Sequence, residues 1–389
     1  MISISRLKSI STFNVYILSI LALVPITTCP AKALVRVKDV KRIAAYTISV
    51  QTPDVTIHGT LTIPNTHTKN PVVILISGSG SQDRDGFAFG HRPFRDWSDY
   101  LVSRGIAVLR YDDRAITNRA DSADNHTSLE LAADVSAIVS YLTKRADIDP
   151  SRIGLVGHSE GAIIASLVAS NNQNIDFLVL LGAPAVNGYE LFLKQKDIWD
   201  LRHNVPPDKK EKGQGITRQL LDAIKSESEF SIAHRRFLEE WRAILIQNNI
   251  RSDTPLPLAL SHLGSRWSWW ILRYDPKTTY AKIKCPTLAI WGELDQQVPP
   301  EVNLPLMNQS FNHNAGFRPI VLRQLNHNFQ SAVSGHPDEY ETINESVSPV
   351  AFYTVGDWID KITYVHPHLN DPYRNRVNSK QKPRNNDEK

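Results

Sequence analysis

The chain has 389 residues, of which 41% are hydrophobic and 22% charged, a composition typical of a globular protein. Its net charge of +4 comes from both ends, because residues 1–33 carry +3 and residues 361–389 carry +4, so the residues between them are acidic overall. Nothing in this distribution argues for nucleic acid as a partner, and we expect none. The two cysteines, Cys29 and Cys285, are too few to form a zinc site of their own.

The N terminus has the pattern of a signal peptide. Arg6 and Lys8 precede an apolar run from Val15 to Ile26, and Ala31-Lys32-Ala33 then matches a cleavage site. The apolar run is short for a permanent membrane-spanning helix. We therefore expect residues 1–33 to be removed, leaving a periplasmic or secreted protein that is not held at the membrane.

Two alternatives to cleavage remain open at this end. The first is a retained membrane anchor. The second is a lipid on Cys29, although Thr28 before it is larger than the residue usually found there. If cleavage follows Ala33, only Cys285 remains, and no internal disulfide can form.

The body of the chain begins with a predicted hairpin and continues with buried strands. Ala44–Gln51 and Val55–Pro64 alternate in polarity around the turn Thr52-Pro53-Asp54. Continuous apolar runs, which are typical of parallel strands buried on both faces, follow at Val72–Ser77, Ile106–Tyr111, Ile153–Val156, Phe177–Leu181, Leu288–Trp291 and Ile320–Leu322.

Helical patterns separate most of these runs. Phe94–Ser103 ends before Gly105, and Thr127–Lys144 is predicted to place five apolar residues on one stripe: Leu129, Leu131, Val135, Ile138 and Leu142. Strands that alternate with helices predict an α/β fold with a mostly parallel central sheet flanked by helices.

The alternation stops between about Val186 and Lys284. This stretch is polar and mostly helix-forming, with Phe237–Ile246 as its clearest amphipathic piece and a tryptophan cluster near its end: Trp267, Trp269 and Trp270. A helical insertion after one strand, followed by a return to the sheet, predicts a cap over the core. A separate domain is the alternative.

The sequence Gly157-His158-Ser159-Glu160-Gly161 lies between a predicted strand and a predicted buried helix that includes residues 162–168. This is the G-x-S-x-G nucleophile motif in the strand–turn–helix context it requires. Glycines two residues from the serine let strand and helix approach each other. We predict Ser159 to be a nucleophile; an ordinary strand–helix turn is the alternative.

A serine nucleophile needs a base and an orienting acid, which follow it in the chain in this fold. Asp295 lies in the loop after the next-to-last sheet strand and is preferred to Glu293, which is closer to the strand. His327 follows the last strand and is the predicted base. His158 and His313 are not expected to act as the base, because side chains adjacent to the serine diverge from it in such a turn and His313 precedes the last strand.

The loop after the first buried strand is predicted to complete an oxyanion hole. It contains Gly78-Ser79-Gly80-Ser81, whose glycines allow close approach of the backbone to a substrate oxygen. We expect the backbone N–H groups of Ser79 and Glu160 to act together. The loop lacks the lysine and the spacing of a phosphate-binding P-loop.

Two charged segments, Gln82–Gly86 and Arg110–Arg114, lie near the same edge of the predicted sheet. We interpret them as a structural ion-pair network that braces the two loops. Substrate binding is the alternative interpretation.

Several of these blocks resemble bacterial α/β-hydrolases related to small serine esterases and often labelled dipeptidyl-aminopeptidase-like. The resemblance covers about Ile43 to Ile362 and is carried by Ser77–Gly80 with Gln82–Gly86, Tyr274-Asp275-Pro276, Lys282–Pro286, Gly292–Asp295 with Val298-Pro299, and Leu325–Gln330. It implies Ser159, Asp295 and His327 as the triad, with Ser79 and Glu160 as oxyanion donors. The sequence departs from the family at Ala115-Ile116-Thr117, where a Gly-x-Gly turn is common, and in the middle of the cap.

Together these features predict an α/β-hydrolase fold with a helical cap. The expected parts are a signal peptide (1–33), a core in two segments (34–185 and 285–362), a cap (186–284) and a disordered basic tail (363–389). The expected activity is hydrolysis of a small-molecule carboxylic ester through an acyl-enzyme, without a metal or organic cofactor. The alternatives are a serine peptidase or amidase, for which Glu239 and Glu240 in the cap could bind a free amine, and a catalytically silent binding protein.

Overall fold

A computed structural model describes residues 43–64, 68–117, 121–254 and 262–363. The predicted signal peptide, including Cys29, and the tail beyond residue 363 lie outside these residues. The predicted hairpin is confirmed: β1 (Ile43–Gln51) pairs antiparallel with β2 (Thr56–Pro64). Within the turn, Thr52 donates its N–H and its hydroxyl to the carbonyl of Val55.

The six apolar runs form parallel strands: β3 (Asn70–Ile76), β4 (Ala107–Tyr111), β5 (Ile148–His158), β6 (Ile175–Leu181), β7 (Thr287–Gly292) and β8 (Phe317–Leu322). With the hairpin they give one eight-stranded sheet in the order β1-β2-β4-β3-β5-β6-β7-β8. The order reverses at β3 and β5, and open α/β sheets bind ligands beyond the carboxyl ends of their strands at such a point.

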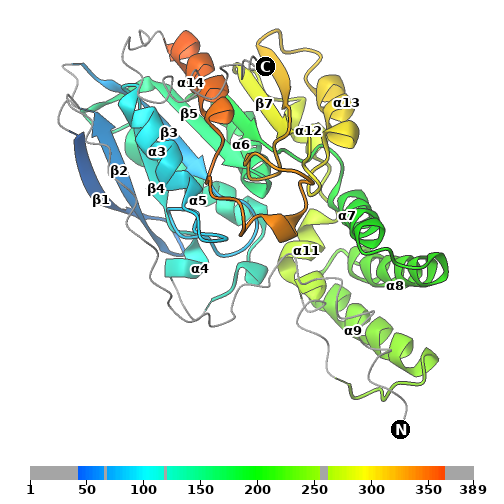
Figure 1. Ribbon diagram of the computed structural model, residues 1–389. Helices are drawn as coiled ribbons and strands as arrows, with labels where there is room; N and C mark the ends of the chain where they lie inside the picture. The colour runs from blue at the N-terminus through cyan, green and yellow to red at the C-terminus, as the bar shows by residue number, and fades with distance from the viewer. Residues whose placement is uncertain (1–42, 65–67, 118–120, 255–261, 364–389) are drawn as a thin grey trace, which may run out of the picture.

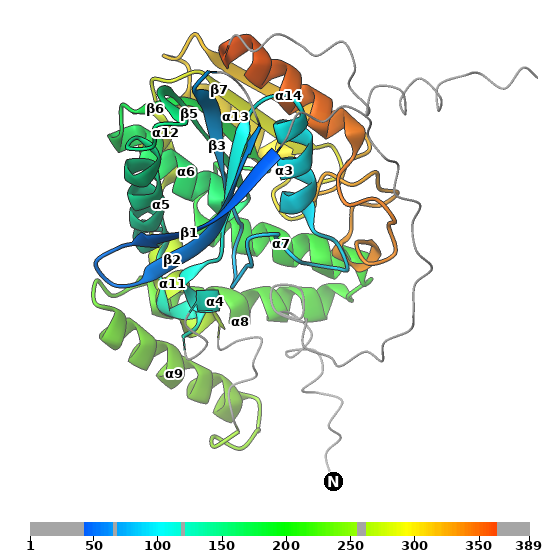
Figure 2. The same cartoon turned by 90° about the vertical axis from the view of Figure 1, so that its left-hand side faces the viewer.

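Helices cover both faces of the sheet (Figures 1 and 2). On one face, α3 (Pro93–Ser103) and α14 (Pro349–Thr363) share a core with the strands. On the other, α5 (Ser128–Leu142), α6 (Glu160–Asn171) and α13 (Pro300–Ser310) do so. The predicted α/β-hydrolase fold with a mostly parallel sheet is therefore confirmed.

The predicted apolar stripe of α5 is wrong at one position. Val135, Ile138 and Leu142 are fully buried, whereas Leu129 is 52% exposed. Leu129 precedes Leu131 by two residues, about 200° around a helix, and therefore points away from the core. The helix begins after Thr127, whose N–H and hydroxyl both donate to the carboxylate of Glu130.

Between β6 and the short helix α12 (Pro276–Tyr280), the described residues form four α-helices, here called the helical insertion, which extend beyond one end of the sheet (Figure 1). They are α7 (Gly188–Arg202), α8 (Pro207–Lys225), α9 (Phe230–Gln247) and α11 (Arg266–Ile271). Their buried residues form a core of their own, which includes Phe237 and Trp241 and which reaches the hydrolase core through Ile163 of α6. Helix α12 leads back to the sheet. Within the described residues, no helix is long and apolar enough to cross a membrane.

Candidate active site

Ser159 lies on the sharp turn between β5 and α6, in a backbone conformation that a non-glycine residue seldom adopts (φ 56°, ψ −120°). Its N–H donates to the carbonyl of Leu181 at the end of β6 (2.8 Å). The two motif glycines are required by space: a Cβ on Gly157 would lie 2.1 Å from the carbonyl oxygen of Gly161, and one on Gly161 would lie 2.2 Å from that of Ile76. The turn thus holds Ser159 rigidly at the sheet edge.

Asp295 and His327 meet as the sequence predicts. Nδ1 of His327 lies 2.7 Å from Oδ2 of Asp295, and both residues are 3% exposed. The other carboxylate oxygen accepts the backbone N–H groups of Gln297 (2.9 Å) and Val298 (2.7 Å). Because a carboxylate so held can only accept a hydrogen bond, it favours the imidazole tautomer with its proton on Nδ1, in which Nε2 is able to accept a proton.

Glu293, the competing acid, does not reach this histidine. It is exposed, and its Oε2 accepts the backbone N–H of Gln324 (3.0 Å). The structure therefore brings Asp295, and not Glu293, to the imidazole.

Ser159 and His327 lie beside the same short segment. Leu181 accepts the N–H of Ser159, and a Cβ on the next residue, Gly182, would lie 3.1 Å from Nδ1 of His327 and 3.3 Å from Oδ2 of Asp295. Gly182 has a φ of 58°. A larger residue at position 182 would clash with the side chains of His327 and Asp295.

His158 has a role that the sequence does not reveal. Its ring lies 4.7 Å from the ring of His327, and its Nε2 is 3.0 Å from the carbonyl oxygen of His327. Loss of solvent around the ring, together with the nearby His327, lowers the pKa of His158 to about 4. His158 is thus neutral at physiological pH, donates from Nε2, and holds the backbone of His327.

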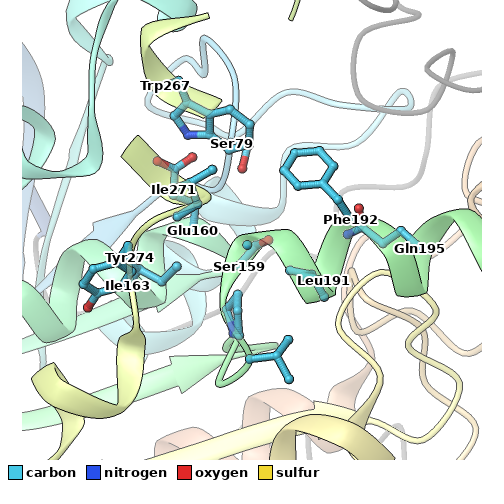
Figure 3. Close-up of a pocket in the computed structure, with 13 residues that line it drawn as sticks. Ser79, Ser159, Glu160, Ile163, Leu191, Phe192, Gln195, Trp267, Ile271 and Tyr274 are labelled. Atoms are coloured by element: carbon cyan, nitrogen blue, oxygen red, sulfur yellow. The ribbon is translucent and has the colours of Figure 1, made fainter. Parts of the chain in front are cut away.

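Ser79 and Glu160 line one cavity together with Ser159 (Figure 3). Among the described residues, none accepts the backbone N–H of Ser79. Glu160 is the first residue of α6, where backbone N–H groups lack partners within the helix. Both predicted donors thus lie where an oxyanion formed at Ser159 could meet them.

The predicted oxyanion loop is tethered at both ends by Asp113, a residue that follows β4. The carboxylate of Asp113 accepts the hydroxyl of Ser77 (3.0 Å) and the backbone N–H of Gln82 (2.9 Å). Asp113 is 8% exposed. Burial raises its pKa to about 7, although both hydrogen bonds favour the ionised form, and the nearby acids Glu160 and Asp134 raise it further.

This titration makes stability depend on pH. Because the folded pKa lies above the ordinary value of 3.8, the ionised Asp113 destabilises the fold, and this cost grows as pH rises from about 4 to 7 and then stays constant. We expect Asp113→Asn to gain stability relative to wild type over that interval, by at most about 4 kcal/mol. Urea unfolding of both proteins at pH 5 and pH 8 measures how the difference in their free energies of unfolding changes with pH. A stability difference that is the same at both pH values would contradict the expectation.

The two charged segments form the predicted ion-pair network. Arg84 pairs with Asp112 (2.5 Å), Arg110 pairs with Asp85, and Arg114 binds Asp134 on α5 through two hydrogen bonds (2.8 and 2.6 Å). The residues that replace the Gly-x-Gly turn of the family continue from Arg114 as a short helix, α4 (Arg114–Thr117).

The helical insertion supplies much of the cavity wall. The cavity has a volume of about 510 Å³, including space open to solvent. Its described lining is mostly apolar and comes from both sides, with Ile163 and Pro184 from the core and Leu191, Phe192, Gln195, Trp267, Ile271 and Tyr274 from the insertion and the segment after it. Glu239 and Glu240 are not among the residues that line it.

Comparison with known proteins finds several that are similar to this chain. It is 32% identical over 285 residues to the esterase EstD of Thermotoga maritima; the match covers 72% of this chain and 60% of that protein's length. Est1E from Butyrivibrio proteoclasticus is 14% identical, with 82% of this chain and 99% of that chain covered and a TM-score of 0.48. An esterase structure from Pyrococcus furiosus is 15% identical, with 82% and 91% covered and a TM-score of 0.48.

A family model for the alpha/beta hydrolase family matches residues 73–342. The match begins in β3, ends beyond His327, and includes Ser159, Asp295 and the whole helical insertion. The chain belongs to the alpha/beta hydrolase family.

Proposed function

We propose that the protein hydrolyses carboxylic esters through an acyl-enzyme formed on Ser159. The observation that carries the proposal is the buried contact of 2.7 Å between His327 and Asp295, beside a serine held on a strained turn. The similarity to EstD, a protein named as an esterase, supports the choice of esters.

In the proposed reaction, Oγ of Ser159 attacks the ester carbonyl while Nε2 of His327 takes its proton. The backbone N–H groups of Ser79 and Glu160 stabilise the oxyanion. His327 then protonates the leaving alcohol, and the acyl-enzyme is released by water that His327 activates. Asp295 stabilises the imidazolium in both halves. The scheme uses no metal and no organic cofactor.

The helical insertion acts in this proposal as a cap over Ser159. Support comes from the cavity, to which α7 and α11 contribute side chains opposite the nucleophile. Residues 186–284 are thus proposed as the cap, between the core segments 34–185 and 285–362. Export of the protein to the periplasm or outside the cell is proposed from residues 1–33 alone.

A peptidase or amidase would use the same groups and is the second candidate. The carboxylates expected to bind a free amine in that case, Glu239 and Glu240, lie on α9; Glu239 is exposed and Glu240 accepts a hydrogen bond from Gln219 (3.0 Å). Their positions away from the cavity favour the esterase over this form of exopeptidase.

A panel of p-nitrophenyl esters and aminoacyl anilides tests the proposal on wild type and Ser159→Ala. We expect ester turnover by the wild type, none above background by the variant, and labelling of the wild type at Ser159 by a fluorophosphonate. Faster anilide than ester cleavage would favour the peptidase. Ester turnover unchanged in Ser159→Ala would overturn the mechanism.

A further inference from the structure

The cavity beside Ser159 contains one acidic side chain whose charge the mechanism does not use. Glu160 supplies a backbone N–H to the proposed oxyanion hole, but its side chain also lines the cavity and is 4% exposed. One carboxylate oxygen accepts the hydroxyl of Ser128 at the start of α5 (2.6 Å). The other has no hydrogen-bond donor among the described residues.

No described cation neutralises this carboxylate. None of the described residues that line the cavity is a lysine, arginine or histidine. Arg114, which lies in the nearby network, is already bound to Asp134 by two hydrogen bonds. The charge of Glu160 is also one of the causes that raise the pKa of the neighbouring Asp113. The Glu160 carboxylate thus lines a largely apolar cavity whose described lining residues include no basic side chain.

The remaining walls include three aromatic side chains, of which Trp267 is stacked on one side by His262 and Tyr274 by Trp270. Phe192, Trp267 and Tyr274 line the same cavity, and the rings of Phe192 and Trp267 meet edge to face with centroids 6.0 Å apart. Figure 3 shows Glu160, Trp267 and Ile271 among the side chains that line this cavity. Aromatic faces attract alkylammonium groups, and a carboxylate adds direct attraction.

We propose that this cavity selects esters that carry an ammonium group, which Glu160 binds beside the aromatic walls. The inference rests on the proposed ester hydrolysis and adds a substrate class to it. The ammonium group can belong to the alcohol, as in a choline ester, or to the acyl part, as in an amino acid ester. Esters with a carboxylate at the same position are repelled.

Two pairs of substrates that differ only in charge test the proposal. Butyrylcholine is compared with its neutral carbon isostere 3,3-dimethylbutyl butyrate, and β-alanine ethyl ester with ethyl butyrate. Each pair is measured on wild type, on Glu160→Gln, and on the matched control Ser128→Ala. Glu160→Gln removes the charge and keeps an oxygen that can accept the Ser128 hydroxyl, whereas Ser128→Ala removes that hydrogen bond and keeps the charge.

The readout is the ratio of kcat/KM for the charged substrate to that for its neutral partner. We expect the wild type to favour the charged member of at least one pair by about tenfold or more, since cation–π and carboxylate contacts in a largely desolvated site add up to such factors. Glu160→Gln should lower that ratio by about the same factor. Ser128→Ala should keep it. The substrate pair whose ratio falls in Glu160→Gln identifies whether the alcohol or the acyl part of the ester enters the cavity.

Failure of this inference is distinguishable from failure of the proposed function. A wild-type enzyme that cleaves the neutral member of both pairs at least as well, or a ratio unchanged in Glu160→Gln, overturns the selectivity. If the wild type cleaves none of the four esters, binding to Ser159→Ala is measured by calorimetry instead. Tighter binding of butyrylcholine than of its neutral isostere, together with loss of that difference in the double variant Ser159→Ala/Glu160→Gln, supports the ammonium site. Equal binding of the two esters overturns it.

Discussion

Asp295→Asn is expected to lower kcat for ester hydrolysis by about 10⁴-fold, by analogy with other triads in which the orienting acid is replaced by its amide. The geometry gives the reason. The oxygen that accepts the N–H groups of Gln297 and Val298 must remain an oxygen in the variant. The amide nitrogen therefore faces Nδ1 of His327, which has to become an acceptor. The proton then lies on Nε2, where the base should be.

Glu293→Gln is the matched control for this substitution. Glu293 is an exposed acid two residues away, and its carboxylate accepts only the backbone N–H of Gln324 (3.0 Å) among the described residues. We expect Glu293→Gln to lower kcat by about tenfold or less, which corresponds to the loss of roughly one hydrogen bond. The kcat of both variants is measured with p-nitrophenyl butyrate, and circular dichroism checks that both are folded. An inactive Glu293→Gln beside an active Asp295→Asn would reverse the assignment of the acid.

The strands and the order of the site residues can be predicted from the sequence because they depend on local patterns. A strand buried on both faces is a short apolar run, so Ile153–Val156 and Leu288–Trp291 identify the cores of β5 and β7. Parallel strands end at one edge of the sheet, so residues that directly follow them are brought together. That rule selects Ser159, Asp295 and His327 without knowledge of any contact between them.

The contacts made across long separations cannot be predicted in the same way. His158 holds the carbonyl of His327, which is 169 residues away, and the carboxylate of Asp113 reaches Ser77 and Gln82. Each pairing depends on the final packing of loops, and neither residue type indicates its partner. The only indication for Asp113 is its place in a charged segment beside the predicted oxyanion loop.

The residues that form the cavity walls cannot be predicted from the sequence for a related reason. Phe192 and Gln195 lie on α7, and the face of α7 that meets the core is set by the packing of the whole helical insertion. The amphipathic pattern of α9 identifies that helix but not its position relative to Ser159. The sequence therefore predicts the triad, whereas the substrate class depends on walls that only the folded chain assembles.

Gly157→Ala is expected to destabilise the fold by about 3 kcal/mol or more, beyond the usual cost of an overpacked side chain, and to abolish activity. The added Cβ would lie 2.1 Å from the carbonyl oxygen and 2.4 Å from the carbonyl carbon of Gly161. These are backbone atoms at the start of α6, so the contact is relieved only by separating α6 from β5. That separation also moves Ser159 and the N–H of Glu160.

The same change at Gly215 should have the opposite sign. Gly215 is exposed within α8, and a Cβ there would meet no atom within 4 Å. Alanine is a better helix former than glycine, so Gly215→Ala should stabilise the protein by up to about 1 kcal/mol. Urea unfolding of both variants against wild type measures the two effects. If Gly157→Ala unfolded at the same urea concentration as wild type, a Cβ at position 157 would have to fit between β5 and α6 despite its distance of 2.1 Å from the carbonyl oxygen of Gly161. The rigidity assigned to the Ser159 turn would then be wrong.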